Sequence, residues 1–379
     1  MKPQAWLSVN FFAFFFTWGV FLPYWTGWLV FEKDLSVAAA SSIIAAGLFA
    51  RSFSTLFLFP ELSKRFSLAV LMKLLPVIST GLLLLFIPID SFFGLTLVMI
   101  LFSLFYPNIL PMMESNASLL MRTDHIHYGR SRSWGSVGYT VGLIVVGVVT
   151  GIWTESAIMG VMFAGSLLMI AAAFQSAPGA LQERVSPQRG GYKAVFKTHG
   201  FLIVMTICIL IQGAHAAYYN YGFIYLQELN VSNGYIGFIL NIAVLSEILF
   251  FTFADRLLKN TPVSTMFIIA SLAAVIRWVA VGLFPTLWIF LITQLFHSLT
   301  FGLAHYAFIR YLYRTVEKPL IPTAQGVYAS LGMGLSAAVL TQIGGVLYDV
   351  SSGLAFIGMG IAVIPAIALS LVMHRKKIA

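Results

Sequence analysis

Long apolar segments take up almost the whole chain, and their length limits what it can fold into. A helix that crosses a bilayer needs about 20 mostly apolar residues, and runs of that length recur here between short polar connections. We therefore predict an all-α membrane protein with twelve transmembrane helices. The predicted spans lie at about 6–31, 36–58, 67–88, 92–121, 133–153, 156–176, 199–227, 233–254, 262–284, 286–313, 321–348 and 352–373.

The composition leaves little of the chain for water-soluble domains. Of its residues 59% are hydrophobic and 9% are charged, whereas a soluble domain is about one quarter charged. The N-terminal apolar stretch is long enough to span and has no small-residue cleavage site after a short core, so we expect a retained first helix. The single cysteine, Cys208, excludes a disulfide framework.

The one long connection, APGALQERVSPQRGGYKAVFKT at 177–198, is polar and rich in Pro and Gly. It predicts an N-terminal six-helix bundle at 1–176, a cytoplasmic linker at 177–198 and a C-terminal six-helix bundle at 199–379. The fifth and eleventh spans both carry many small residues, which allow helices to approach closely. This six-plus-six pattern resembles the outline of a major facilitator transporter.

The distribution of charge predicts the orientation in the membrane. The net charge is +9, and the basic residues gather in one alternating set of loops, which the positive-inside rule makes cytoplasmic. We expect both termini on that side of a bacterial inner membrane, the lipid bilayer as a partner and no nucleic acid. The cytoplasmic set comprises Lys2, Lys64, Arg65, Arg122, Arg130, Arg132, Arg184, Arg189, Lys193, Lys197, Arg256, Lys259, Arg314, Lys318, Arg375, Lys376 and Lys377.

Ionisable side chains inside the spans are candidate functional residues, because each costs about 2.5 to 3.5 kcal/mol on insertion scales. In the first half, Glu114 and Arg132 enter from the same side and can meet. Their pair is either an interfacial salt bridge or a polar clamp that binds substrate. Arg51 lies about two turns from the cytoplasmic end, where it could snorkel or serve an anion.

The second half carries the predicted proton-coupling residues. Counting about 1.5 Å per residue places His215, Glu247 and His297 near the midplane and Arg277 about 10 Å from the outer face. Desolvation favours a protonated carboxyl group and a nearby arginine favours the carboxylate, so Glu247 could load and release a proton; the alternative is a static pair with Arg277. The histidines could bind substrate or relay a proton, or only pack. We also predict substrate contacts from Tyr218 and Asn241, and a structural role for His305.

Part of the sequence resembles the lactose permease group of sugar:proton symporters. The likeness runs from Glu114 through YGRSRSWGSVGY and implies that Glu114 and Arg132 hydrogen-bond substrate, with Tyr139 at the place of a stacking Trp. Glu247, Arg277 and His297 resemble that group's binding and coupling residues. Two departures, Thr300 in place of a protonatable glutamate and Gln294 in place of a basic residue, prevent its proton path from being copied.

A resemblance over nearly the whole chain points to the phenylpropionate permease family. It rests on FFTWGVFLPYW, GLFARS, YGRSRSWGSVGY, LIQGAHAAYYNY, LSEILFF, VIRW and QGVYASLGMG. It implies proton-coupled uptake of 3-phenylpropionate or a related aromatic acid, with Arg132, Arg51 or Arg277 as the carboxylate partner. The resemblance to the superfamily implies a cytoplasmic gate, for which the loop FADRLLKN keeps Asp255 and Arg256, with Glu61 as the substitute in the first half.

These features favour a proton-coupled secondary transporter that works by alternating access, with substrate between the halves. The rival substrate is a neutral sugar or nucleoside, because Glu114 would repel an anion unless Arg132 neutralised it. A membrane enzyme is disfavoured, since no nucleophile with a base and no H-E-x-x-H motif is present. We expect no cofactor, no metal and a monomer.

Overall fold

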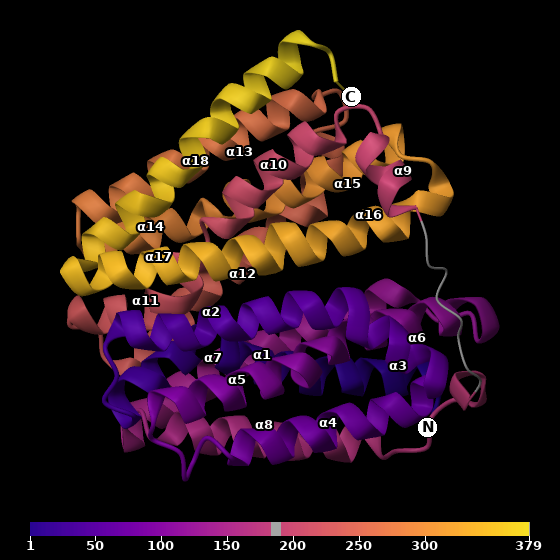
Figure 1. Cartoon of the computed structure of the whole chain (residues 1–379), viewed down its shortest axis with the longest axis vertical. Helices are drawn as coiled ribbons and strands as arrows, with labels where there is room; N and C mark the ends of the chain where they lie inside the picture. Colours follow the sequence, from indigo (N-terminus) through magenta and orange to yellow (C-terminus); the bar gives the residue numbers. More distant parts are fainter. Residues whose placement is uncertain (183–190, 379) are drawn as a thin grey trace. The chain divides into compact units, whose positions relative to one another are not determined.

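Helices are the only regular elements in the described residues of this computed structural model, which are 1–182 and 191–378 (Figure 1). In this part of the chain, ten helical segments are long and apolar enough to cross a membrane. Two shorter apolar helices, Leu68–Leu84 and Ala157–Ala173, complete the series. The predicted all-α fold with twelve spans is confirmed. Arg184 and Arg189 of the predicted cytoplasmic set lie outside the described residues.

The spans before the linker begin and end close to the predicted positions. They are α1 (Pro3–Glu32); α2 (Val37–Phe53) with η1 (Ser54–Leu58) and α3 (Phe59–Arg65); α4 (Leu68–Leu84); α5 (Phe92–Phe105) with η2 (Tyr106–Asn108) and α6 (Ile109–Thr123); α7 (Tyr128–Trp153); and α8 (Ala157–Ala173).

The spans after the linker follow the short helix α9 (Tyr192–Lys197). They are α10 (Phe201–Gly213) with α11 (Ala216–Glu228); α12 (Asn233–Leu257); α13 (Val263–Leu283); α14 (Leu287–Leu295) with η4 (Ser298–Leu303) and α15 (Ala304–Thr315); α16 (Ile321–Val327) with η6 (Tyr328–Leu335) and α17 (Ser336–Val350); and α18 (Ser352–Arg375).

Several spans are interrupted, which the apolar runs alone did not predict. Three of the interruptions, η1, η4 and η6, are π-helical, and the seventh span breaks between Gly213 and Ala216. Short π-helical segments inside α-helices occur frequently at functional sites. The interruptions at His215 and in η4 supply the polar side chains described below.

The chain divides into two compact units, which we describe separately. Unit 1 consists of Met1–Leu35, Ala46–Gln188 and Ser232–Phe238, and unit 2 of Ser36–Ala45, Arg189–Val231 and Ile239–Ala379. The division predicted at the linker 177–198 stays a prediction.

Small residues bring helices close together inside each unit. In unit 1, α1 lies along α7, and a Cβ added to Gly19 would lie 2.5 Å from the carbonyl oxygen of Tyr139. In unit 2, α13 lies along α18 (Figure 1), where Gly282 and Gly353 each face the carbonyl oxygen of the other. The close approach expected of small residues therefore shapes both units.

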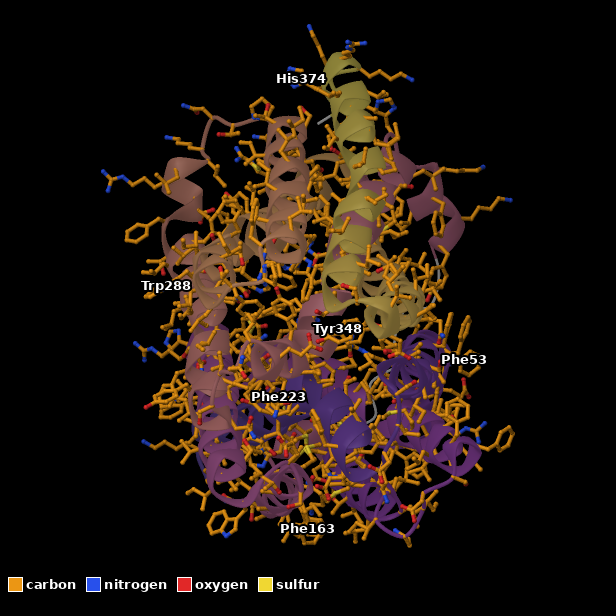
Figure 2. All side chains as sticks on the ribbon, turned by 90° about the vertical axis from the view of Figure 1, so that its left-hand side faces the viewer. Phe53, Phe163, Phe223, Trp288, Tyr348 and His374 are labelled. Atoms are coloured by element: carbon orange, nitrogen blue, oxygen red, sulfur yellow. The ribbon has the colours of Figure 1, made fainter. Side chains whose placement is uncertain are left out.

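Large apolar side chains also point outward, as a membrane protein requires. Trp288 is 74% exposed and Phe53 is 58% exposed, and Figure 2 shows both at the periphery, while Phe223 is fully buried. A soluble protein rarely leaves so many large apolar groups in water. Contact with lipid explains their exposure.

Candidate functional site

The break between α10 and α11 in unit 2 fixes the orientation of His215. The backbone N–H of His215 bonds to the carbonyl of Gln212, and its side-chain Nδ1 lies 3.0 Å from the carbonyl oxygen of Ile211. Because a carbonyl oxygen only accepts, Nδ1 carries the proton. The other ring nitrogen, Nε2, is therefore the acceptor of the neutral imidazole.

Arg277 is the centre of the polar cluster in unit 2. Its side chain on α13 is fully buried, and Nη1 donates to Thr300 Oγ1 at 3.0 Å and to His297 Nδ1 at 3.2 Å. The guanidinium carbon lies 4.3 Å from the ring centroid of Trp278 and 5.0 Å from that of Tyr218. Among the described residues, neither Nε nor Nη2 has a hydrogen-bond partner.

The hydrogen-bond partners in this cluster determine which atom donates and which accepts in each bond. Thr300 accepts from Arg277, so its own proton goes to His215 Nε2 at 3.0 Å. His297 accepts from Arg277 at Nδ1, which leaves its proton on Nε2, 3.6 Å from Glu247 Oε2. Both histidines are therefore neutral, in opposite tautomers.

The two histidines, which the sequence placed only at similar depth, lie close together. The rings of His215 and His297 have centroids 5.4 Å apart and meet edge to face. The helical segments α10, α13 and η4 contact one another here. Of the residues predicted to couple protons, the structure brings Glu247, Arg277 and His297 together; that they couple protons stays a prediction.

A column of stacked rings extends from His297 along the tenth span. Phe301 lies 5.3 Å from His297 with an interplanar angle of 3°, and His305 lies 6.2 Å from Phe301 with an angle of 5°. Residues four apart lie on the same face of a helix, which places the rings of His297, Phe301 and His305 one above another along this span. His305 Nδ1 is 3.2 Å from the hydroxyl of Tyr328, which also accepts from Gln212 at 3.0 Å.

Two predicted substrate contacts occupy different places in unit 2. Tyr218 lies against the Arg277 guanidinium and is nearly fully buried. Asn241 is buried on α12, six residues before Glu247, which corresponds to about 9 Å along the helix axis. Their contact with substrate stays a prediction.

Glu114 and Arg132 meet in unit 1, as predicted. Arg132 Nε lies 3.6 Å from Glu114 Oε1, and both side chains are more than one third exposed. The Tyr128 hydroxyl hydrogen-bonds Glu114, and the Arg132 guanidinium lies 4.3 Å from the ring centroid of Phe15. Arg132 therefore has both a charged and an aromatic partner.

The remaining first-half candidates lie on α2 and α7. The Arg51 guanidinium lies 5.1 Å from the ring centroid of Trp18 on α1, and its snorkelling or anion-binding role stays a prediction. Tyr139 is half-buried, and its backbone carbonyl faces Gly19. An apolar groove of about 570 Å³ at the start of α1 and α7 contains none of the predicted site residues.

The predicted cytoplasmic gate residues are both exposed, at the end of α12. Asp255 Oδ1 accepts a hydrogen bond of 2.8 Å from the hydroxyl of Tyr306 on α15. In the first half, Glu61 forms ion pairs with Lys64 and Arg65 one turn away. A gating role for Asp255 and Arg256 stays a prediction.

The sequence alone did not predict that three residues of these clusters make contacts there. Thr300 was noted only as a departure from a resembling group, Trp278 only as part of VIRW, and Tyr128 only as part of YGRSRSWGSVGY. Spacing gives a signal for the first, since a residue three positions from His297 lies on the same helix face. No cluster of metal-ligating side chains exists among the described residues.

The helical spans and the buried charged cluster together define a class: a polytopic membrane transporter. Charged groups inside spans are kept where a solute or ion has to pass. The chain belongs to the MFS_1 like family, which matches residues 4–357. This confirms the predicted superfamily and identifies a transporter rather than an enzyme.

Two relatives are named as transporters, and a solved structure shares the fold. The chain is 28% identical to the probable 3-phenylpropionic acid transporter of Escherichia coli (strain K12) over 97% of each chain. It is 27% identical to the maltose permease of Geobacillus stearothermophilus over 66% of this chain and 64% of that one. The nucleoside transporter NupG has a similar fold, with a TM-score of 0.81 at 14% identity over 99% of each chain.

Proposed function

We propose that the protein is a proton-coupled secondary transporter that works by alternating access and imports a small aromatic carboxylate such as 3-phenylpropionate. One observation carries the proposal: the buried guanidinium of Arg277 has an edge, formed by Nε and Nη2, without a hydrogen-bond partner among the described residues. A buried polar group without a partner costs about 1 to 3 kcal/mol. An anionic ligand would remove that cost.

The chemistry of this edge favours a carboxylate. The N–H groups on Nε and Nη2 point the same way, so one carboxylate can accept both in the bidentate geometry that arginine favours. Nη1, the third nitrogen, is already used by Thr300 and His297. Tyr218 and Trp278 lie against the guanidinium, so aromatic side chains border the place that we propose for the substrate's ring.

Charge balance supports proton coupling. Arg277 is positive, Glu247 contributes a negative charge through His297, and both histidines are neutral. A bound carboxylate adds a negative charge that nothing in this cluster balances, and an unbalanced buried charge is expensive. One proton taken up with each substrate restores neutrality, and Glu247 is its proposed carrier.

The relatives support two substrate classes. The E. coli relative is named for an aromatic acid, while the maltose permease and NupG are named for a sugar and for nucleosides. The second candidate, a neutral sugar or nucleoside, is favoured by Glu114 and Arg132, whose charged groups can bind hydroxyls. Glu114, Arg132 and Tyr139 are proposed substrate contacts in either case.

We propose that the protein is a monomer in a bacterial inner membrane, with both termini in the cytoplasm. The basic residues in one alternating set of loops support this orientation. The linker at 177–198 then lies in the cytoplasm.

A ligand screen on the purified protein tests the substrate class. Any ligand that binds the native state raises the melting temperature, so we expect 3-phenylpropionate to raise it and the neutral 3-phenylpropionamide, maltose and uridine to have little effect. Stabilisation by maltose or uridine, with none by the acid, would reject the carboxylate. Uptake of the acid into proteoliposomes should increase with an inward proton gradient, and insensitivity to that gradient would reject proton coupling.

A further inference from the structure

We infer that Thr300 determines the specificity of Arg277 for a carboxylate, because its hydroxyl holds the guanidinium in place without neutralising it. The inference rests on the proposed function of the same site. It assigns Thr300, and His215 behind it, as positioning residues rather than as substrate ligands.

The geometry around Thr300 allows one arrangement of protons. Its side chain is fully buried in η4, and Oγ1 lies 3.0 Å from both Arg277 Nη1 and His215 Nε2. Arginine can only donate, so the hydroxyl accepts from Arg277 and donates to His215. His215 is held in turn by the Ile211 carbonyl at 3.0 Å. The helix break thus fixes the direction of the whole chain of hydrogen bonds.

This chain keeps the unpartnered edge of Arg277 in one orientation. With Nη1 held by Thr300 and His297, and with Trp278 and Tyr218 against the guanidinium, the planar group has little freedom to turn. A planar fork that is already oriented loses less side-chain entropy when a carboxylate binds. Thr300 therefore contributes to affinity without touching the substrate.

The chemical type of residue 300 matters because of its charge. An acidic side chain at this position would place a carboxylate against Nη1 and neutralise Arg277, so a substrate carboxylate would bring an excess negative charge. An apolar side chain would leave both Nη1 and His215 Nε2 with one partner fewer. A hydroxyl avoids both the neutralisation of Arg277 and the loss of hydrogen bonds, since it accepts from the cation, donates to the imidazole and stays neutral.

The test measures the preference for 3-phenylpropionate over 3-phenylpropionamide by calorimetric titration of the full-length protein. We expect Thr300→Glu to lower the affinity for the acid by about tenfold or more, as loss of a charge-assisted pair implies, while binding of the amide changes little. Thr300→Gln, the neutral match in size, should keep the preference for the acid. Thr300→Ser should keep the wild-type affinity, because it keeps the hydroxyl.

The outcomes separate this inference from the proposed function. A wild-type protein that binds no aromatic acid rejects the proposed function, whereas wild-type binding with an unchanged preference in Thr300→Glu rejects only the inference. If Thr300→Glu does not fold, the nearly isosteric Thr300→Val replaces it. That variant should bind the acid more weakly than Thr300→Ser, and equal affinities would overturn the inference.

Discussion

His297 Nε2 lies 3.6 Å from Glu247 Oε2, while the opposite nitrogen of the same ring accepts a hydrogen bond from Arg277. The imidazole therefore connects a buried cation with a carboxylate and holds its own proton on the carboxylate side. His297 can accept a second proton only if Arg277 withdraws from Nδ1. Glu247 is open to protonation without that movement.

Glu247→Gln should separate proton coupling from substrate binding. Glutamine keeps the size and a hydrogen-bond acceptor toward His297, but it cannot carry a proton. We expect proteoliposomes with this variant to exchange labelled substrate across the membrane yet to show no accumulation driven by a pH gradient. Accumulation at the wild-type level would show that another group carries the proton.

Arg277→Lys should weaken binding of the aromatic acid sharply. Lysine keeps the charge but offers a point donor in place of the two parallel N–H groups. We expect at least a tenfold loss of affinity, about 1.4 kcal/mol, measured by calorimetric titration of the purified protein. Lys73→Arg, on α4 in unit 1, is the control and should bind the acid as the wild type does. An unchanged affinity in Arg277→Lys would place the carboxylate elsewhere.

Arg132→Lys distinguishes the two interpretations of the Glu114 pair. If Arg132 binds substrate, the loss of its planar group should reduce affinity strongly, because lysine cannot reproduce the fork or the contact with Phe15. If the pair only links α6 and α7, the affinity for substrate should stay unchanged. The fold should also be little affected, since a partly exposed ion pair contributes about 0 to 1 kcal/mol to stability. We expect the first result in a titration with the substrate that the ligand screen identifies.

Gly138→Ala should destabilise the contact between α1 and α7. An added Cβ would collide with the backbone carbonyl of Phe12, and overpacking of this kind typically costs about 1 to 3 kcal/mol. The matched control is Gly160→Ala on α8, where the added Cβ meets open space. We expect a lower apparent melting temperature for the first variant only; equal shifts in both would contradict the packing argument.

The spans could be predicted from the sequence because the length of an apolar run can be read from the run itself. Twenty apolar residues identify a helix without reference to its neighbours, and the ends of α7 and α18 fell within a few residues of the predicted positions. The meeting of Glu114 and Arg132 was also predictable, because a short loop joins their helices. Both inferences depend on distance along the chain.

The hydrogen bonds of Arg277 could not be predicted in the same way. A count of residues along an ideal helix placed Arg277 nearer the outer face than His297, and only packing in three dimensions joins its guanidinium to Thr300. The Thr300–His215 bond further depends on the break before α11 and on the π-helical turn η4. In an apolar span, a single threonine looks like any small packing residue.

The π-helical turn Ser298–Leu303 also limits how the gene can change. A π-helical turn holds about one residue more than an α-helical turn, so deletion of one codon here would tighten it to an α-helix and leave the helix on either side in place. The four-residue spacing from His297 to Phe301, or from Phe301 to His305, would then become three, and the column would break at that point. Homologues with the same stack of rings should therefore keep the length of this turn.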